Sequence, residues 1–353
     1  MFKFNLKKIT LQFKHPSGTS RGVLTEKHSW YVTLSSTDSA NKGIGEISII
    51  PGLTPEFKDL DSYQKWLDEC IDELNQANLD DLMFMHFIGQ WYDKPSLFFG
   101  LETAFHDFIA GGNQVLYDTP FTHRRDSIPI NGLIWMGDEK FMQEQIEEKL
   151  KEGYKCIKLK IGAIDFETEI RLLTGLRERF SPEKLTLRVD ANGAFSPEEA
   201  PEKLQRLAEL SIHSIEQPIK AGNWNEMAKL CASTPCPIAL DEELIGVYDF
   251  ETKTALLNNI RPQYIILKPS LHGGIQGCQE WIELAHEKNI EWWITSALES
   301  NVGLSAIAQF VSNYSPELFQ GLGTGSLYVQ NSVARTEVKR GKLYFIPPRL
   351  SRE

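Results

Sequence analysis

The first part of the chain alternates hydrophobic and polar positions and then changes to a helical spacing. Residues 2–13 and 23–34 alternate strictly enough to predict two antiparallel strands joined by the loop HPSGTSRG, and residues 43–50 predict a third. The segments LDSYQKWLDECIDELNQ and SLFFGLETAFHDFIAG follow, with apolar residues at helical spacing. Strands followed by helices predict an α+β domain over residues 1–125.

From Ile128 onwards, short segments rich in β-branched residues recur about every 25 to 30 residues, with amphipathic segments such as GIQGCQEWIELAHEKN between them. This period is typical of a βα barrel. The predicted strands lie near residues 128–137, 156–162, 185–192, 213–219, 237–244, 264–269, 291–299 and 320–324. We therefore expect an α/β fold, a modified (β/α)8 TIM-type barrel over residues 126–325, with residues 326–353 returning to the capping domain. A doubly wound open sheet is the alternative.

Composition limits the class of partner. The 353 residues include 41% hydrophobic and 24% charged residues, as in an ordinary globular protein, and the length suggests about two domains. The formal charge of −11 disfavours nucleic acid and anionic membranes, so we expect a small-molecule partner. The five cysteines contain no CxxC pair, and no long apolar run is present, which together predict a cytoplasmic protein with reduced thiols.

Candidate chemistry begins in the segment YKCIKLKIG. Lys158 and Lys160 share one face of a predicted strand because side chains alternate, while the intervening apolar residues share the other. Two such lysines alone are typical of a solvated edge strand. Polar residues at the ends of the later strands change that interpretation: Asp190, Glu216, Asp241, Lys268 and Ser296.

In a barrel these strand ends converge on one mouth. Asp190, Glu216 and Asp241 would offer oxygen ligands without histidine or cysteine, a set that suits Mg²⁺ (or Mn²⁺) and not zinc. A nearby dication and the ammonium of Lys158 would both lower the pKa of Lys160, so that Lys160 can act as a base. A structural cluster of salt bridges is the alternative.

The pattern KxK, DxN, E, DE and K on successive strands, behind an α+β domain that ends in FFGLETAFHDF, resembles the enolase superfamily, in its muconate-lactonizing-like branch. The segments RVDAN, LKPS and TSALES are most similar to members that dehydrate 2-succinyl-6-hydroxy-2,4-cyclohexadiene-1-carboxylate to o-succinylbenzoate in menaquinone synthesis. The resemblance implies a Mg²⁺-dependent lyase that proceeds through a metal-stabilised enediolate.

The resemblance also implies roles for individual residues. Lys160 would remove the α-proton and return it to the departing hydroxyl, Lys268 would stabilise the enediolate from the opposite face, and the three carboxylates would hold Mg²⁺. The residues expected to bind substrate or to support the ligands are Lys158, Arg188, Asn192, Ser296, Gly323, Thr324 and, in a lid, Ser20 and Arg21.

Several alternatives remain open at this point. Dipeptide epimerases and N-succinylamino-acid racemases share the lysine pair; the epimerases carry Asp-x-Asp where this chain has GTGS at residues 323–326, whereas the racemases share the succinyl group. The Ser296 region disfavours muconate cycloisomerisation. Residues 18–22, GTSRG, match the G-x-S-x-G of serine hydrolases, but that motif needs a following helix and a strand pattern follows. A non-catalytic metal-binding barrel is the last alternative.

Overall fold

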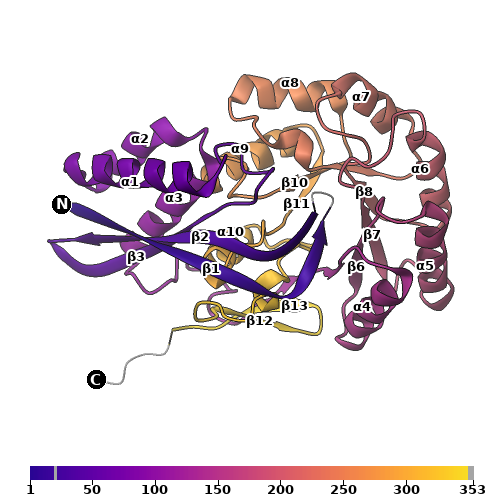
Figure 1. The fold of residues 1–353 in the computed structure, drawn as a ribbon, viewed down its shortest axis with the longest axis horizontal. Coiled ribbons are helices and arrows are strands. Elements are labelled where there is room, and N and C mark those ends of the chain that lie inside the picture. Colours follow the sequence, from indigo (N-terminus) through magenta and orange to yellow (C-terminus); the bar gives the residue numbers. More distant parts are fainter. Residues whose placement is uncertain (20–21, 349–353) are drawn as a thin grey trace.

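The computed structural model describes residues 1–19 and 22–348. It places a three-stranded antiparallel sheet with its helices beside a curled parallel sheet that is surrounded by helices (Figure 1). The predicted capped α/β barrel is thereby confirmed as the fold class. Ser20 and Arg21, predicted to form a lid, lie outside the described residues.

The antiparallel sheet packs one face on helices. Its order is β1-β2-β3, and its elements are β1 (Phe2–Thr19), β2 (Gly22–Ser36), β3 (Ser39–Ser48), α1 (Leu60–Gln76), α2 (Asp81–Ile88), η1 (Gly89–Trp91) and α3 (Pro95–Ile109). The alternation along β2 buries Trp30, Val32 and Leu34 completely in one core with these helices. The absence of a side chain at Gly43 lets α3 lie directly on β3, since a Cβ there would come 1.9 Å from the Ala104 carbonyl oxygen.

Two features of this region differ from the sequence prediction. Strand β1 continues past residue 13 to Thr19 with a register shift between Gln12 and Ser17, and Phe13 pairs with Tyr328 near the far end of the chain. Helix α2 was not predicted; Asp80 caps it by accepting backbone hydrogen bonds from its first turn. Tertiary pairing and a short local cap therefore set these boundaries.

The parallel sheet has seven strands in the order β11-β10-β9-β8-β7-β6-β5. Its strands are β5 (Gly132–Ile134), β6 (Cys156–Lys160), β7 (Thr186–Asp190), β8 (Ser214–Glu216), β9 (Ile238–Leu240), β10 (Tyr264–Leu267) and β11 (Glu291–Ile294). The connecting helices are α4 (Glu139–Lys151), α5 (Phe166–Arg179), α6 (Ala200–Glu209), α7 (Trp224–Ser233), η2 (Glu242–Leu244), α8 (Phe250–Ile260), α9 (Gly274–Glu287) and α10 (Asn301–Ser312).

The predicted eighth strand, residues 320–324, is reduced to two β-bridges. Gln320 pairs with Ile130, and Gly321 pairs with Thr295. The backbone N–H of Asn131 donates to the Gln320 carbonyl oxygen at 3.0 Å, so this segment links both edges of the open sheet. The glycine-rich sequence GLGTG that follows explains why no longer strand forms.

The first predicted barrel strand divides in two, because β4 (Ile128–Pro129) pairs with β13 and only β5 joins the barrel sheet. The C-terminal part contains η3 (Thr324–Ser326), β12 (Thr336–Lys339) and β13 (Lys342–Phe345), and its sheet has the order β12-β13-β4. The domain limits at residues 125 and 325 stay predictions. No helix in the described part of the chain is long and apolar enough to cross a membrane.

Candidate active site

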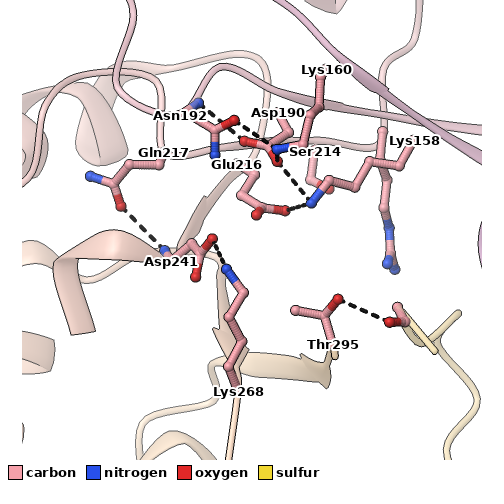
Figure 2. A network of polar contacts seen from close by, with 12 residues as sticks. Lys158, Lys160, Asp190, Asn192, Ser214, Glu216, Gln217, Asp241, Lys268 and Thr295 are labelled. Atoms are coloured by element: carbon pink, nitrogen blue, oxygen red, sulfur yellow. Dashed lines mark hydrogen bonds and ion pairs between the residues drawn. The ribbon is translucent and has the colours of Figure 1, made fainter. Parts of the chain in front are cut away.

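The carboxyl ends of five neighbouring strands bring six charged side chains together (Figure 2). The parallel register aligns Lys160 with Asp190 and Asp190 with Glu216. Because parallel strands in register present equivalent positions at the same level, these groups reach the same face of the sheet. The charged groups at this mouth are Lys158 and Lys160 of β6, Asp190 of β7, Glu216 of β8, Asp241 after β9 and Lys268 after β10.

Ammonium and carboxylate groups alternate across this mouth. The Nζ of Lys158 lies 3.0 Å from Asp190 Oδ2 and also contacts Glu216 Oε2. The Nζ of Lys160 lies 3.0 Å from the same Asp190 oxygen, while the Nζ of Lys268 contacts Asp241 Oδ2. The strands β7, β8 and β9 separate the two lysine-bearing sides, so amines approach the carboxylates from opposite sides of the mouth.

All three carboxylates are at most 2% exposed. Burial alone would raise the pKa of Asp190, but the ammonium groups of Lys158 and Lys160 outweigh it and hold that pKa below its ordinary value. Burial and the neighbouring charge of Asp190 raise the pKa of Glu216 well above its ordinary value. The pKa of Lys268 is raised because the attraction of Asp241 exceeds the opposing effect of burial. The carboxylates of the mouth therefore favour the charged forms of Lys158 and Lys268.

The donor set fits a hard divalent cation, although the lysines now lie against it. Among the described residues, no three acidic, histidine or cysteine side chains are already grouped to hold a metal ion. The three carboxylates nevertheless offer only oxygen ligands, and Asp241 Oδ1 is buried without a hydrogen-bond partner. A dication could replace ammonium groups as the positive partner of these oxygens, so the residues fit Mg²⁺ once the lysine side chains shift.

Left-handed backbone conformations position the supporting amides. Asn192 has a φ of 44° and its backbone N–H donates to Asp190 Oδ1 at 3.1 Å, a local turn that asparagine tolerates. Its side-chain oxygen accepts from Lys160 Nζ at 2.8 Å, and its Nδ2 donates to Glu242. The DxN motif thus orients a carboxylate and an amine together.

A cavity of about 1010 Å³ opens at this mouth. Its wall includes most of the residues singled out from the sequence: Lys158, Lys160, Asp190, Asn192, Glu216, Asp241, Lys268, Ser296, Gly323 and Thr324. It also includes residues that the sequence did not single out, among them Leu24, Ile50, Asn131, Trp135 and Tyr154. Asn131 and Trp135 lie within the predicted first barrel strand, on either side of β5, and could have been found from that position, whereas the capping residues Leu24 and Ile50 carry no local signal.

One expected site residue, Arg188, has surroundings that differ from the expectation. Arg188 does not line the cavity; its guanidinium lies 3.8 Å from the centre of the Trp293 ring and donates to the Phe319 carbonyl oxygen. These contacts do not support direct binding of a substrate by Arg188. Strand β2 begins at Gly22, so a strand and not a helix follows the GTSRG segment, against the hydrolase alternative.

Comparison with known proteins gives a consistent family relationship. Residues 141–349 match the family described as enolase C-terminal domain-like. The chain is 49% identical to the o-succinylbenzoate synthase of Desulfotalea psychrophila, over 97% of this chain and 98% of the relative. It is 27% identical to the L-Ala-D/L-Glu epimerase of Bacillus subtilis, over 54% and 51% of the two chains. The crystal structure of MenC from D. psychrophila superposes with a TM-score of 0.84 at 44% identity, covering 97% of this chain and 99% of that one.

Proposed function

Because this chain belongs to the enolase C-terminal domain-like family, we propose that it is a lyase that dehydrates 2-succinyl-6-hydroxy-2,4-cyclohexadiene-1-carboxylate to o-succinylbenzoate, a step of menaquinone synthesis. The observation that carries the proposal is the 49% identity to an o-succinylbenzoate synthase over nearly the full length of both chains. The identity to the epimerases of B. subtilis and Maribacter sp. is lower, at 27% and 26%. The family resemblance predicted from the motifs is confirmed by the family match.

Lys160 and Lys268 have different roles in the proposed reaction. Lys160, held beside Asp190 and Asn192, is the group we assign as base: it removes the α-proton and returns it to the hydroxyl that leaves from the same face. Lys268 approaches from the side of β10 and keeps its proton because Asp241 raises its pKa despite burial. An ammonium group at this position would stabilise negative charge that develops on the substrate carboxylate.

We infer that Asp190, Glu216 and Asp241 hold Mg²⁺, with Mn²⁺ as a substitute. When bound, the cation polarises the substrate carboxylate and makes its α-proton more acidic. The buried oxygen of Asp241 that lacks a partner supports this assignment. Lys158, which contacts both Asp190 and Glu216, then orients the two carboxylates. The five cysteines are buried free thiols, which supports the cytoplasmic location expected from the sequence.

A substrate competition tests the proposal. The purified protein with Mg²⁺ is offered the cyclohexadiene substrate and a set of N-succinylamino acids in parallel, and aromatic product and change of optical rotation are followed. We expect dehydration with a kcat/KM far above that of any racemisation. Racemisation of N-succinylamino acids without dehydration would contradict the proposed function and support the racemase alternative. Turnover without any added or retained dication would contradict the proposed role of Mg²⁺.

A further inference from the structure

A buried polar cluster lies where the antiparallel sheet meets the barrel. We call it the interface cluster, and its members are Lys27, Ser29, Ser48, Ser270, Ser296 and Glu299. Lys27 of β2 is 4% exposed and donates to Ser29 Oγ at 2.9 Å and Ser48 Oγ at 2.6 Å. Glu299 comes from the barrel and is completely buried. The cluster reaches the cavity through Ser296, which forms part of the cavity wall.

The hydrogen bonds around Glu299 all run toward its carboxylate. Glu299 accepts from Ser270 Oγ with one oxygen and from Ser296 Oγ with the other, both at 2.5 Å. Ser296 Oγ in turn accepts from Thr324 Oγ1 at 2.9 Å. A hydroxyl group has one proton to donate. The protons of Ser296 and Thr324 are therefore both directed toward Glu299, and these two cavity-wall hydroxyls present only acceptor lone pairs to the cavity.

This direction is unsuited to an anionic ligand. An ionised carboxylate only accepts hydrogen bonds, so it gains nothing from hydroxyls that present lone pairs. Thr324 becomes a donor to the cavity when its proton turns away from Ser296, and Ser296 becomes one only when its proton leaves Glu299. Glu299 then keeps a hydrogen bond to Ser296 only if it donates to it instead, and a carboxyl group donates only when it is protonated.

Resting on the proposed function, we propose that Glu299 is a positioning residue that takes up one proton from solvent when the succinyl carboxylate binds beside Ser296 and Thr324. The proton adds to the Glu299 carboxylate, whose O–H then donates to Ser296 Oγ. The hydroxyl protons of Ser296 and Thr324 turn toward the bound carboxylate. One negative charge leaves Glu299 as another arrives with the ligand, so the charge of the region is unchanged and no covalent bond other than O–H is formed.

The surroundings of Glu299 favour such an exchange. Burial raises the pKa of Glu299, while its hydroxyl donors and the ammonium of Lys27 act in the opposite direction and Glu46 of β3 adds to the increase. Among the described residues, Tyr328 also faces it; this tyrosine is buried and donates to the Leu298 carbonyl oxygen. Lys27 thus favours the ionised form of Glu299, while burial and Glu46 favour the protonated form; burial also lowers the pKa of Lys27 itself.

Calorimetry on the full-length protein with saturating Mg²⁺ tests the proposal. Binding of o-succinylbenzoate is measured in buffers of different ionisation enthalpy, which gives the number of protons taken up, and benzoate serves as the ligand without the succinyl tail. We expect about one more proton for o-succinylbenzoate than for benzoate. The dissociation constant should then weaken by about tenfold per pH unit above the pKa of Glu299 in the free protein.

Two variants sharpen the result. In Glu299→Gln the extra proton uptake and the pH dependence should both vanish, because the amide can donate to Ser296 without titrating. Glu46→Gln removes the neighbouring buried acid and should leave the uptake near one. Equal uptake for the two ligands in the wild-type protein, persistent uptake in Glu299→Gln, or no binding of o-succinylbenzoate to a protein that turns over the substrate would each overturn the inference. The absence of turnover would instead contradict the proposed function.

Discussion

The mouth of the barrel and the contact between the antiparallel sheet and the barrel both bury carboxylates, but they satisfy them differently. At the mouth, Asp190 and Asp241 are paired with lysine ammonium groups. At the contact, Glu46 of β3 accepts from the backbone N–H groups of Ser300 and Gly303, each at 2.9 Å, at the start of α10. The first arrangement uses mobile cations, and the second uses fixed dipoles.

Glu102 of α3 repeats the second arrangement at another helix. Its two oxygens accept from Ile275 N at 2.6 Å and Gln276 N at 2.9 Å in the first turn of α9. Backbone donors cannot leave without unwinding the helix, so Glu46 and Glu102 fix the antiparallel sheet and its helices on the barrel. A lysine side chain, in contrast, can change rotamer without any change in the backbone. The comparison teaches that the carboxylates expected to change partner when a metal binds are paired with lysine side chains. The carboxylates that join the two parts of the fold, Glu46 and Glu102, are paired with backbone N–H groups at helix ends.

The largest expected effect comes from removing the assigned base at the mouth. Lys160→Ala should lower kcat by about 10³-fold, since general bases contribute about 10² to 10⁴-fold. The fold should persist because the Lys160 side chain is partly exposed and supports no core. Single-turnover kinetics and circular dichroism measure the two properties. Lys155→Ala, exposed just before the same strand, is the matched control. A Lys160→Ala enzyme that retained more than a few per cent of wild-type turnover would contradict the assignment.

The second expected effect is a loss of Mg²⁺ affinity in variants of the mouth carboxylates but not in a variant of Glu102. Asp190→Asn, Glu216→Gln and Asp241→Asn should each weaken Mg²⁺ binding at least about tenfold, because each loses a charged oxygen ligand. Glu102→Gln, equally buried but satisfied by a helix end, should leave it unchanged. Calorimetric titration of the substrate-free protein with MgCl₂ provides the measurement. Equal Mg²⁺ affinities in all four variants would place the ligands elsewhere.

A smaller loss of kcat is expected from substitution of Asn192, which contacts Lys160. Asn192→Ala removes the oxygen that accepts from Lys160 Nζ at 2.8 Å, and should lower kcat about tenfold while Mg²⁺ affinity stays within a factor of about three. Asn289→Ala is a suitable control, because Asn289 also has a left-handed backbone, with φ 55°, and is exposed between α9 and β11. A loss of Mg²⁺ affinity as large as the loss of kcat would make Asn192 a support for the metal and not for the base.

Local sequence patterns predicted the residues at the mouth of the barrel but not those at the contact between the antiparallel sheet and the barrel. The residues of the mouth each end a strand, so strand period and residue type were enough to bring Lys160, Asp190 and Glu216 together. Helix α1 has the predicted bounds, 60–76, because Asp59 caps an amphipathic segment. Glu46 could not be found in this way: its partner Ser300 is 254 residues away, and nothing in either segment indicates the pair.

Tertiary contacts also explain the remaining differences. Gln320 and Gly321 close the barrel with two bridges instead of a strand, because each pairs with a different edge of the sheet. Arg188 was a candidate because its segment RVDAN resembles the family motif, yet it stacks on Trp293 although it shares a strand face with Asp190. Position along a strand predicts the direction of a side chain and not how far it lies from the mouth. Glu299 was overlooked although Ser296 is only three residues away, because its second hydroxyl donor, Ser270, is 29 residues away in the chain.

The smallest expected effect tests whether a helix end alone keeps a buried carboxylate ionised. Burial raises the pKa of Glu102 to about 8, although the N–H groups of Ile275 and Gln276 act in the opposite direction. A carboxyl group with a raised pKa binds its proton more tightly in the folded chain than in the unfolded one, so the free energy of unfolding falls as pH rises from about 4.5 toward 8. From pH 7 to pH 8 this group should remove about 1 kcal/mol.

Glu102→Gln should abolish that part of the pH dependence while leaving kcat unchanged, because Glu102 lies outside the cavity wall. Urea unfolding of the wild type and the variant at pH 6, 7 and 8 measures it, and the difference between the two curves isolates the group from all other titrations. A wild-type free energy of unfolding that falls relative to that of the variant as pH rises would mean that burial dominates and the carboxyl group is protonated near neutral pH. Parallel curves would mean that the first turn of α9 keeps Glu102 ionised throughout. In that case a helix end keeps a buried carboxylate ionised as well as a lysine ammonium does. The two regions then differ only in whether the partner of the carboxylate can move.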